Sequence, residues 1–420
     1  MSNPGAGRLL PEIRAAGYAL LPPVYADSGP ERPHPGSRAD QMGASIVLLG
    51  TFETKAEELL ELESALIAEG LEVTRMDLSL ESGETSMPAD AKLARMKDRA
   101  ENAAKAVSKD MPAAVIGVGG GTGSEMVLQA MRPLPLDLPK FLVTTLPFDP
   151  RGNVADCPVT LIPSPCDIQG VNSTLRQLFA RTAAMVASVV DERIRRIGRH
   201  KGIAVSLLGV TQAAGARAIR LLRAAGHETS TFHASGFGGA ALVRFAREGM
   251  FEGMIDLTVN EIVRMHIAGA HTPMPERFTC GRDLPRIVVP GALNFLDAGS
   301  PGTLRRSWRV RAHYCHSSHF THVKLNESEI VRAARALATD LNCSRAHCEI
   351  LLPMGGFSSE DRPGGAIEDP GLRECAAEVF EKEATAFEVT RMPDHINSPE
   401  VATRAVARLL ARLPSGDSKP

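Results

Sequence analysis

Short runs of β-branched and apolar residues alternate with long helical runs through most of this chain. The first such unit consists of the run Ser45–Leu49, the turn Gly50–Thr54, and a helical run in which Leu59, Leu62 and Leu66 share one face. This alternation is typical of βαβ units. We therefore predict an α/β fold in which largely parallel sheets are flanked by helices.

The pattern of the first half is repeated later in the chain. Ile203–Thr211 resembles Ile46–Thr51, and Leu221–Glu228 resembles Leu66–Glu72. Two shorter matches follow in the same order, Arg286–Gly291 with Leu142–Pro147 and Glu349–Met354 with Val159–Pro163. These matches predict two Rossmann-like subdomains, residues 45–200 and residues 201–420, preceded by an extension over residues 1–44 that is rich in proline and glycine.

Composition excludes several classes of protein. Of the 420 residues, 47 are Lys or Arg and 49 are Asp or Glu, so the formal charge of -2 leaves no basic surplus for a nucleic-acid partner. Aromatic residues make up 4%, which leaves few platforms for stacking bases. No apolar run approaches the roughly 18 residues that a membrane-spanning helix needs. The seven cysteines have no regular spacing, and we expect a cytoplasmic protein with reduced thiols.

The stretch Gly117–Gly123 is the strongest candidate for a ligand contact. It lies where a buried strand ends and a helix begins, which is where open α/β sheets bind ligands. Glycines let an anion approach the backbone, and the helix that follows offers unpaired N–H groups. It is not a Walker loop, because no Gly-Lys-Ser/Thr follows, and Thr122 replaces the third glycine of a dinucleotide fingerprint. Against the alternative of a tight turn, we predict phosphate contacts from Gly119, Gly120, Gly121, Thr122 and Gly123.

The turn after the first strand is a second candidate of the same kind. We predict nucleotide contacts from Gly50, Thr51, Thr54 and Lys55, because the Lys55 ammonium could reach a phosphate as a point charge. The alternative is that Thr51 and Thr54 only cap the helix that follows.

Several strand ends in the second half also carry glycine or polar residues. Phe232–Gly239 ends a short strand and opens a helix, and Thr211 follows the preceding strand. Residues 354–365 form a long Gly/Ser loop, and such loops in compact domains are usually functional or mobile. Asp394–Asn397 follows the last strand, where a capped turn is an equally good interpretation. Against plain turns, we predict nucleotide contacts from Thr211, His233, Ser235, Gly236, Gly238, Gly239, Gly355 and Gly356.

Four histidines recur at every third residue, and this spacing raises the question of zinc. They are His313, His316, His319 and His322. A spacing of three places successive residues on opposite faces of a strand and drifts around a helix, so all four cannot converge on one ion, although two could. We therefore predict no metal site here.

Taken together, these stretches resemble a known family, the ATP-binding domain at the N-terminus of the plant tomato mosaic virus resistance protein with its bacterial and fungal relatives. The resemblance covers roughly residues 45–413 and rests on an ordered set of motifs: Gly50–Lys55, Gly117–Gly123, Phe232–Gly239, Asp256–Thr258 with Glu261, Pro290–Ala292, Leu352–Gly356 and Asp394–Asn397. It implies two Rossmann-like subdomains, ATP as the ligand and a homodimer. The chain departs from the family pattern at Glu53 (Asp in the family), Ala56 (Gly) and His316–Ser318 (His-Asn-Pro).

Three hypotheses for function follow from these motifs. The first is an ATP-binding protein whose phosphates are held by glycine-rich strand-to-helix loops, with phosphoryl transfer or hydrolysis assisted by Mg²⁺ as its enzymatic version. The second is a regulatory module in which the nucleotide stabilises one conformation without being consumed. The third is an enzyme that acts on a small sugar or a phosphorylated acid held by the same loops. No residue is assigned a catalytic role.

Overall fold

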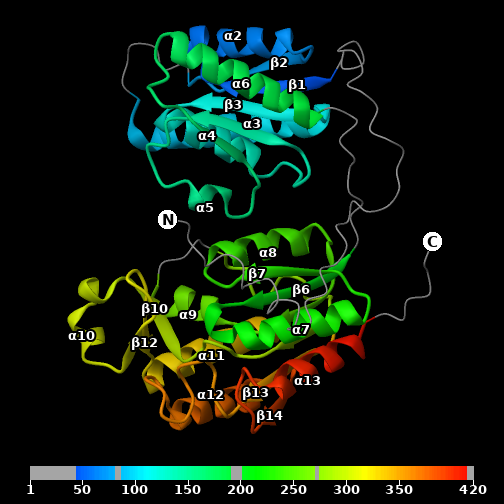
Figure 1. The fold of residues 1–420 in the computed structure, drawn as a ribbon, viewed down its shortest axis with the longest axis vertical. Helices are drawn as coiled ribbons and strands as arrows, with labels where there is room; N and C mark the ends of the chain where they lie inside the picture. The colour runs from blue at the N-terminus through cyan, green and yellow to red at the C-terminus, as the bar shows by residue number, and fades with distance from the viewer. Residues whose placement is uncertain (1–43, 81–86, 191–200, 270–273, 414–420) are drawn as a thin grey trace, which may run out of the picture. The chain divides into compact units, whose positions relative to one another are not determined.

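The computed structural model describes residues 44–80, 87–190, 201–269 and 274–413. These residues form two α/β halves, which span residues 44–190 and 201–413 (Figure 1). The extension expected over residues 1–44, apart from residue 44, lies outside the described residues. So do residues 191–200, which contain the end of the first predicted subdomain.

The first half contains a five-stranded sheet in which all paired strands run parallel. Its strand order is β2-β1-β3-β4-β5. The strands are β1 (Ser45–Gly50), β2 (Glu72–Asp77), β3 (Ala114–Gly119), β4 (Lys140–Thr144) and β5 (Thr160–Pro163). The helices are α2 (Phe52–Ala68), α3 (Ala89–Asp110), α4 (Gly121–Met131), α5 (Arg151–Val154) and α6 (Ser173–Val190).

Both faces of the first sheet are covered by helices, as Figure 1 shows. Ile46 and Leu48 of β1 pack into one core with apolar residues of α2 and α6. Val47 and Leu49 pack into a second core with apolar residues of α3 and α4. Successive residues of a strand point to opposite faces, so a strand buried on both sides has the continuous apolar sequence seen here.

The second half contains a six-stranded sheet, also parallel at each pairing, in the order β14-β13-β9-β8-β6-β7. The strands are β6 (Gly202–Leu207), β7 (Thr229–His233), β8 (Phe251–Asp256), β9 (Arg286–Val288), β13 (Cys348–Pro353) and β14 (Glu388–Met392). The helices are α7 (Gln212–Ala224), α8 (Phe237–Arg247), α9 (Asn260–His266), α10 (Arg306–Arg309), α11 (Glu327–Leu341), α12 (Pro370–Glu383) and α13 (Pro399–Leu410), with single turns η2 (Gly209–Thr211) and η3 (Pro301–Thr303).

A small antiparallel sheet is inserted between β9 and β13. Its strands are β10 (Phe295–Ala298), β11 (His313–Cys315) and β12 (Thr321–Lys324), in the order β10-β12-β11. The pairing places His322 opposite Asp297 on one side and opposite Tyr314 on the other. The hairpin of β11 and β12 therefore reverses the chain within the histidine series.

The two parallel sheets share one strand order. Numbered from its own first strand, each sheet runs 2-1-3-4-5, and the second adds a sixth strand after the fifth. In this numbering β9 corresponds to β4 and β13 to β5, which are the matches that the sequence predicts. The predicted fold class, two Rossmann-like α/β subdomains with parallel sheets flanked by helices, is confirmed.

In both sheets the chain moves outward in one direction from the first strand and then returns to build the other side. The point of reversal lies between β1 and β3 in the first sheet and between β6 and β8 in the second. Loops at the carboxyl ends of the strands on either side of such a switch point diverge and leave a crevice for ligands. The predicted loops after β1 and β3 flank the first switch point.

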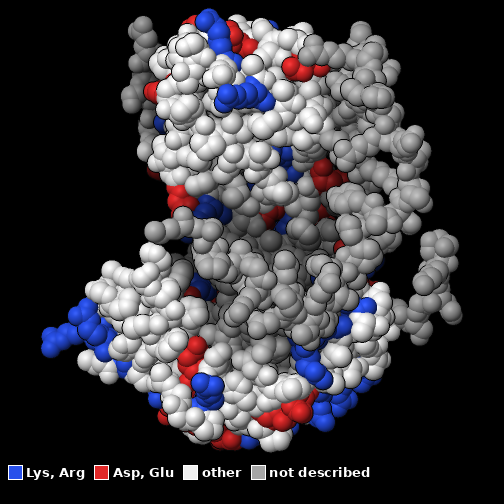
Figure 2. Space-filling model, viewed as in Figure 1, with Lys and Arg blue, Asp and Glu red and all other residues white. Residues whose placement is uncertain are grey.

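Charges of both signs lie on the face of the molecule drawn in Figure 2. Figure 2 shows Lys and Arg side chains interspersed with Asp and Glu side chains on the described parts of this face. This distribution agrees with the near balance of charges in the sequence. Among the described helices, none has both the length and the apolarity needed to cross a bilayer.

Candidate functional site

The two predicted loops of the first half meet at one cavity. The loops lie next to each other because β1 pairs in parallel with β3. The cavity has a volume of about 330 Å³. Its lining residues are Thr51, Glu53, Thr54, Lys55, Leu80, Lys92, Gly120, Gly121, Thr122, Gly123 and Met126. Seven of the nine residues predicted in this half as nucleotide contacts therefore line one cavity, and Gly50 and Gly119 do not.

The glycine loop turns directly into helix α4. The helix begins at Gly121, so Gly121, Thr122 and Gly123 form its first turn. The N–H group of Ser124 bonds to the carbonyl of Gly120 at 2.9 Å. Within the described chain, the N–H groups of Gly121, Thr122 and Gly123 have no hydrogen-bond acceptor. Three unpaired amides and the positive end of the helix dipole thus lie at the cavity.

The glycines of these two loops have two different roles. A Cβ atom at Gly119 would lie 2.3 Å from the backbone nitrogen of Ser124, and one at Gly50 would lie 2.6 Å from a methyl group of Leu59. Both positions need glycine for packing. A Cβ atom at Gly120 would meet nothing within 4 Å, and one at Gly121 would meet only Pro147, at 3.6 Å. None of the glycines from 119 to 123 has a positive φ angle, so backbone strain does not explain them. Gly120 and Gly121 instead leave space for a ligand.

The threonines of the first loop do not cap helix α2. Thr51 occupies the N-cap position, yet its hydroxyl bonds to the hydroxyl of Thr54 at 2.9 Å and caps no amide. The first amides of α2 are paired instead with side chains at the end of β2 and just after it. The N–H of Phe52 donates to Asp77 at 3.0 Å, and the N–H of Glu53 donates to the hydroxyl of Ser79 at 2.8 Å. Burial opposes ionisation of Asp77, but hydrogen bonds from Ser79 and Phe52 outweigh it and lower the pKa of the carboxyl group.

Two lysines line the cavity, and their contacts differ. The ammonium of Lys55 donates to the carbonyl of Ile168 and, at 3.0 Å, to the side-chain oxygen of Gln169. These bonds hold the segment between β5 and α6 against α2. Lys92, on the exposed face of α3, has no ion pair among the described residues. Lys92 is therefore the more available cation, although the sequence prediction names Lys55.

The glycine loop after β7 already holds an anion that belongs to the protein. The N–H groups of Gly236 and Gly239 donate to Oε1 of Glu261, at 2.9 and 3.1 Å. A Cβ atom at Gly239 would lie 2.3 Å from the same carboxylate oxygen, and one at Gly238 would lie 2.2 Å from the carbonyl of His233. Gly238 and Gly239 are therefore explained by internal packing. The N–H groups of Gly236 and Gly239 are already used in hydrogen bonds to Glu261.

Glu261 belongs to a buried network of four charged side chains. Arg277 donates to Glu261 and to Asp256, each at 2.6 Å. The Nε atom of Arg286 lies 3.4 Å from the second oxygen of Asp256. Burial opposes ionisation of Asp256, but the two guanidinium groups prevail and lower its pKa. Because two carboxylates face two guanidinium groups, the network is charge-balanced within the core.

The other predicted residues of the second half are packed in a similar way. Thr211 is fully buried, and its hydroxyl bonds to that of Thr258 at 2.8 Å. A Cβ atom at Gly355 would lie 2.6 Å from the backbone nitrogen of His395, and one at Gly356 would lie 1.8 Å from the carbonyl of Asp361. The long loop over residues 354–365 is therefore folded on itself, and both glycines are required by internal packing.

The run Asp394–Asn397 joins two strand ends. The side-chain amide of Asn397 donates to the carbonyl of Val210 at 2.9 Å, and its oxygen accepts from the N–H of Ala214 at 3.3 Å. The Nε2 atom of His395 lies 2.9 Å from the carbonyl of Ser358. These bonds support the structural interpretation of this run.

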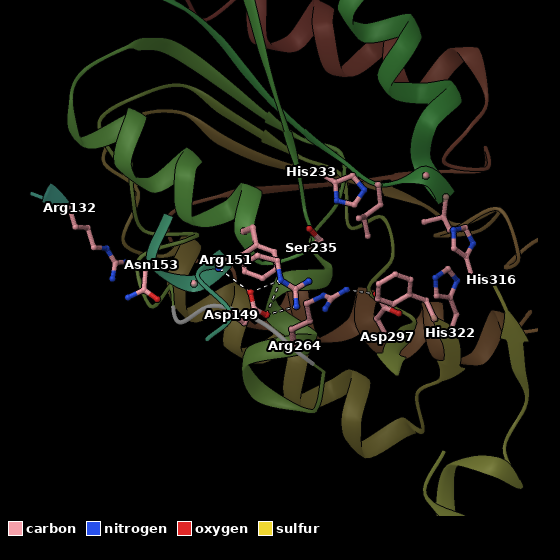
Figure 3. Close-up of a pocket in the computed structure, with 16 residues that line it drawn as sticks. Arg132, Asp149, Arg151, Asn153, His233, Ser235, Arg264, Asp297, His316 and His322 are labelled. Atoms are coloured by element: carbon pink, nitrogen blue, oxygen red, sulfur yellow. Dashed lines mark hydrogen bonds and ion pairs between the residues drawn. The ribbon is translucent and has the colours of Figure 1, made fainter. Parts of the chain in front are cut away.

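A second cavity lies at the carboxyl edge of the second sheet (Figure 3). Of the predicted residues in this half, His233 and Ser235 line it. Its lining also includes four polar residues of the second half that the nucleotide-contact prediction does not name, Arg264, Asp297, His316 and His322. Arg264 projects from α9, Asp297 and His322 lie on paired strands of the inserted sheet, and His316 follows β11.

Asp297 and Arg264 form a largely buried pair at this cavity. The guanidinium of Arg264 contacts one carboxylate oxygen of Asp297 and, at 3.1 Å, the side-chain oxygen of Asn260. The other oxygen of Asp297 has no hydrogen-bond partner among the described residues. Burial raises the pKa of Asp297 against the opposing charge of Arg264. A carboxyl group with a raised pKa at a cavity is suited to proton exchange with a ligand.

The sequence does not show that Arg264, Asp297, His316 and His322 form one cluster, because they come from separate elements. Residues 264 and 297 are polar positions without a motif, and only the inserted sheet brings 297 beside 322. The one signal in the sequence is the histidine series, which marks the hairpin but does not show how it folds.

The fold and the two strand-end cavities define a protein of two Rossmann-like α/β domains with a cavity at the carboxyl edge of each parallel sheet. Two family models match the sequence, both described as "Uncharacterised protein family (UPF0261)", the N-terminal domain over residues 84–195 and the C-terminal domain over residues 200–413. A UPF0261 protein of Mesorhizobium japonicum is 30% identical over 396 residues, which cover 87% of this chain and 98% of the relative. The chain belongs to the UPF0261 family.

Other relatives include a second bacterial protein and a tomato protein. A UPF0261 protein of Rhizobium meliloti is 29% identical over 388 residues, 86% of this chain and 97% of the relative. The ToMV resistance protein Tm-1(GCR237) of Solanum lycopersicum is 26% identical over 314 residues, 72% of this chain and 42% of the tomato protein. The predicted relation to the tomato proteins is thus confirmed at the level of sequence similarity. Among solved structures, MurG of Acinetobacter baumannii has a TM-score of 0.21 at 12% identity, a likeness too small to support an argument.

Proposed function

We propose that the first half binds ATP, with the triphosphate held at the cavity between the β1–α2 and β3–α4 loops. The observation that carries this proposal is the set of three unpaired N–H groups at Gly121, Thr122 and Gly123 beside a topological switch point. An anion at this position accepts hydrogen bonds from amides that otherwise have no partner and lies at the positive end of α4. The resemblance carried by these loops adds ATP as the expected anion.

The surroundings of the cavity support a multiply charged ligand. Lys92 and Lys55 supply cations at its edge, and Gly120 and Gly121 leave its wall without side chains. The volume of about 330 Å³ falls within the range of small-molecule sites. Mg²⁺ enters this proposal as part of the MgATP complex. All seven cysteines, each within the described residues, are free thiols, in keeping with a reducing compartment such as the cytoplasm.

The decisive variant is Gly120→Val. A Cβ atom at this position meets no protein atom within 4 Å, so the variant folds, but its branched side chain projects into the space proposed for the phosphates. We expect isothermal titration calorimetry to show MgATP affinity reduced at least about tenfold, equivalent to roughly 1.4 kcal/mol. Circular dichroism should show an unchanged fold. Gly302→Val is the matched control, because a Cβ atom at Gly302 also meets nothing within 4 Å and the position lies in the second half.

Unchanged ATP affinity in a folded Gly120→Val protein contradicts the proposal. Weak ATP binding combined with tight binding of a sugar phosphate, sensitive to the same variant, supports the third hypothesis instead. Phosphate release by the wild type distinguishes hydrolysis from a regulatory role, and light scattering with and without MgATP tests the homodimer.

A further inference from the structure

The hairpin of β11 and β12 brings two of the four spaced histidines together. Cys315 pairs with Thr321, so His316, the residue after β11, and His322, on β12, lie on either side of the reversal of the chain. Their imidazole rings stack with centroids 4.7 Å apart, and Figure 3 shows the two side chains next to each other. His313 is held elsewhere, with its Nδ1 atom 2.8 Å from the carbonyl of Arg311, and His319 is exposed. As expected, only two of the four converge among the described residues, but a third residue joins the pair, and this reopens the question that the sequence prediction of no metal site had answered.

The third residue is Glu360, from the loop after β13. One nitrogen of each histidine and one carboxylate oxygen of Glu360 all lie within 4.8 Å of one another. The side chains of His322 and Glu360 are 7% and 11% exposed, so these two groups are largely withdrawn from water. Nδ1 of His322 and Oε2 of Glu360, 3.9 Å apart, have no hydrogen-bond partner among the described residues. Buried polar atoms without partners are rare, and an absent ion is one of the few explanations for them.

We propose that His316, His322 and Glu360 bind a divalent transition metal ion, with Zn²⁺ as the best fit to two imidazoles and one carboxylate. Three such ligands at about 2.0–2.2 Å from the ion lie about 3.3 Å from one another in a tetrahedral site. His316 is exposed and can rotate to close the present separation, while His322 is fixed by stacking on Phe295 at 4.1 Å. The site thus consists of one exposed ligand and two largely buried ones.

The composition of the site indicates a metal with an open position. Structural zinc sites have four protein ligands, whereas two histidines and one glutamate are typical of sites that keep a place for water or substrate. His316 and His322 line the cavity of Figure 3, so the fourth position opens toward Asp297 and Arg264. Arg264 does not compete with the ion for ligands, because it is paired with Asp297 and Asn260.

A second cluster, His347, Glu349 and Glu388, has similar spacing but a different electrostatic setting. There the Nε atom of Arg408 lies 3.6 Å from the buried carboxylate oxygen of Glu349 and already supplies a cation. Glu388 is 62% exposed. This cluster is therefore a rival to be tested and not the site we favour.

The test uses the full chain, stripped with a chelator and titrated with Co²⁺ and Zn²⁺ at constant pH. We expect one equivalent of Co²⁺ to produce the visible absorption of a four-coordinate site. Zn²⁺ should displace it with a Kd below about 1 µM. The variants His316→Ala and Glu360→Gln should each weaken Zn²⁺ binding at least about tenfold. The matched control is His319→Ala, an exposed histidine of the same series outside the cluster, and it should bind as the wild type does.

Three outcomes overturn the proposal. They are no stoichiometric binding by the wild type, unchanged affinity in His316→Ala and Glu360→Gln, and loss of binding in His347→Ala alone. Circular dichroism confirms that each variant is folded. His316 is chosen because removing an exposed side chain creates no void in the hydrophobic core. Titration of the same variants with MgATP keeps this proposal separate from the ATP proposal, since the metal site should not affect nucleotide affinity in the first half.

Discussion

The Nε atom of Arg277 lies 2.6 Å from Oε2 of Glu261, and neither side chain is exposed to solvent. This pair connects the glycine loop after β7, through Glu261, to Asp256 at the end of β8. The charges stabilise the second half only as a complete set, because each compensates another that water cannot reach.

Replacing Arg277 with methionine should therefore destabilise the protein strongly. The change leaves Glu261 and Asp256 with one guanidinium, that of Arg286, in place of two, and we expect a loss of about 3–5 kcal/mol in the free energy of unfolding. Chemical denaturation followed by circular dichroism measures this loss. The control is Arg247→Met, since Arg247 pairs with Glu276 and is 57% exposed, and it should cost less than about 1 kcal/mol. Equal effects of the two changes contradict the proposed role of burial.

The glycines of the β3–α4 loop should respond differently to alanine. Gly119→Ala places a Cβ atom 2.3 Å from the backbone nitrogen of Ser124, which cannot move without displacing the start of α4. We expect a loss of about 1–3 kcal/mol in thermal or chemical unfolding. Gly121→Ala, whose Cβ atom meets only Pro147 at 3.6 Å, should change the stability by less than about 0.5 kcal/mol. A larger loss at 121 than at 119 would falsify this division of roles.

The two lysines at the first cavity should differ in their effect on ATP. Lys92→Ala removes a cation with no ion pair among the described residues, and we expect MgATP affinity to fall by about threefold to tenfold. Lys55→Ala should change it by less than about threefold and lower stability, because Lys55 bonds to Ile168 and Gln169. Calorimetric titration measures both variants. Lys97→Ala, on the same helix and outside the lining of the cavity, is the control.

Asp340, near the C-terminus of α11, should make the protein less stable above about pH 6. Burial raises its pKa from 3.8 to about 6, against the opposing charge of Arg286. Between these values the folded protein binds more protons than the unfolded chain, so the free energy of unfolding falls as the pH rises through this window. Asp340→Asn removes the titrating carboxyl group and with it this fall in the free energy of unfolding. We expect it to raise stability at pH 7.5 by about 1 kcal/mol, reduced by solvent screening at this half-buried side chain.

Thermal unfolding at pH 4 and pH 7.5 tests the effect of Asp340. The variant should match the wild type at pH 4, where the folded protein holds the carboxyl group protonated, and exceed it at pH 7.5. Glu378→Gln, at an exposed acid on α12, controls for the change in net charge and should show no such difference between the two pH values.

The architecture and the first cavity could be predicted from the sequence. Both depend on local patterns at strand ends, and a parallel sheet brings the ends of neighbouring strands together. Gly50–Lys55 and Gly117–Gly123 each follow a strand, and the carboxyl ends of parallel strands share one edge. Once β1 and β3 are neighbours, their loops must be adjacent. The exact start of α4 at Gly121 and the packing role of Gly119 depend on side chains and could not be read from the pattern.

The second half shows where such reasoning stops. Phe232–Gly239 has the residues of an anion-binding loop, but a local motif cannot reveal that Glu261 already occupies its amides. Likewise, the spacing of the histidines does not show that the chain reverses between His316 and His322, or that Glu360 approaches them from the loop after β13. Both cases depend on contacts between elements that are distant in the sequence.

The carboxylate of Glu261, which is bound by the loop after β7, also gives the glycine loops of the two halves a different dependence on ligand concentration in the cell. An anion that is part of the chain has an effective concentration that does not change with metabolism, and any free phosphate must compete with it at a disadvantage. The amides of Gly121, Thr122 and Gly123 in the loop after β3 have no such partner within the described chain. On the ATP proposal, the loop after β7 is permanently filled by its own side chain, whereas the occupancy of the loop after β3 follows the concentration of the nucleotide.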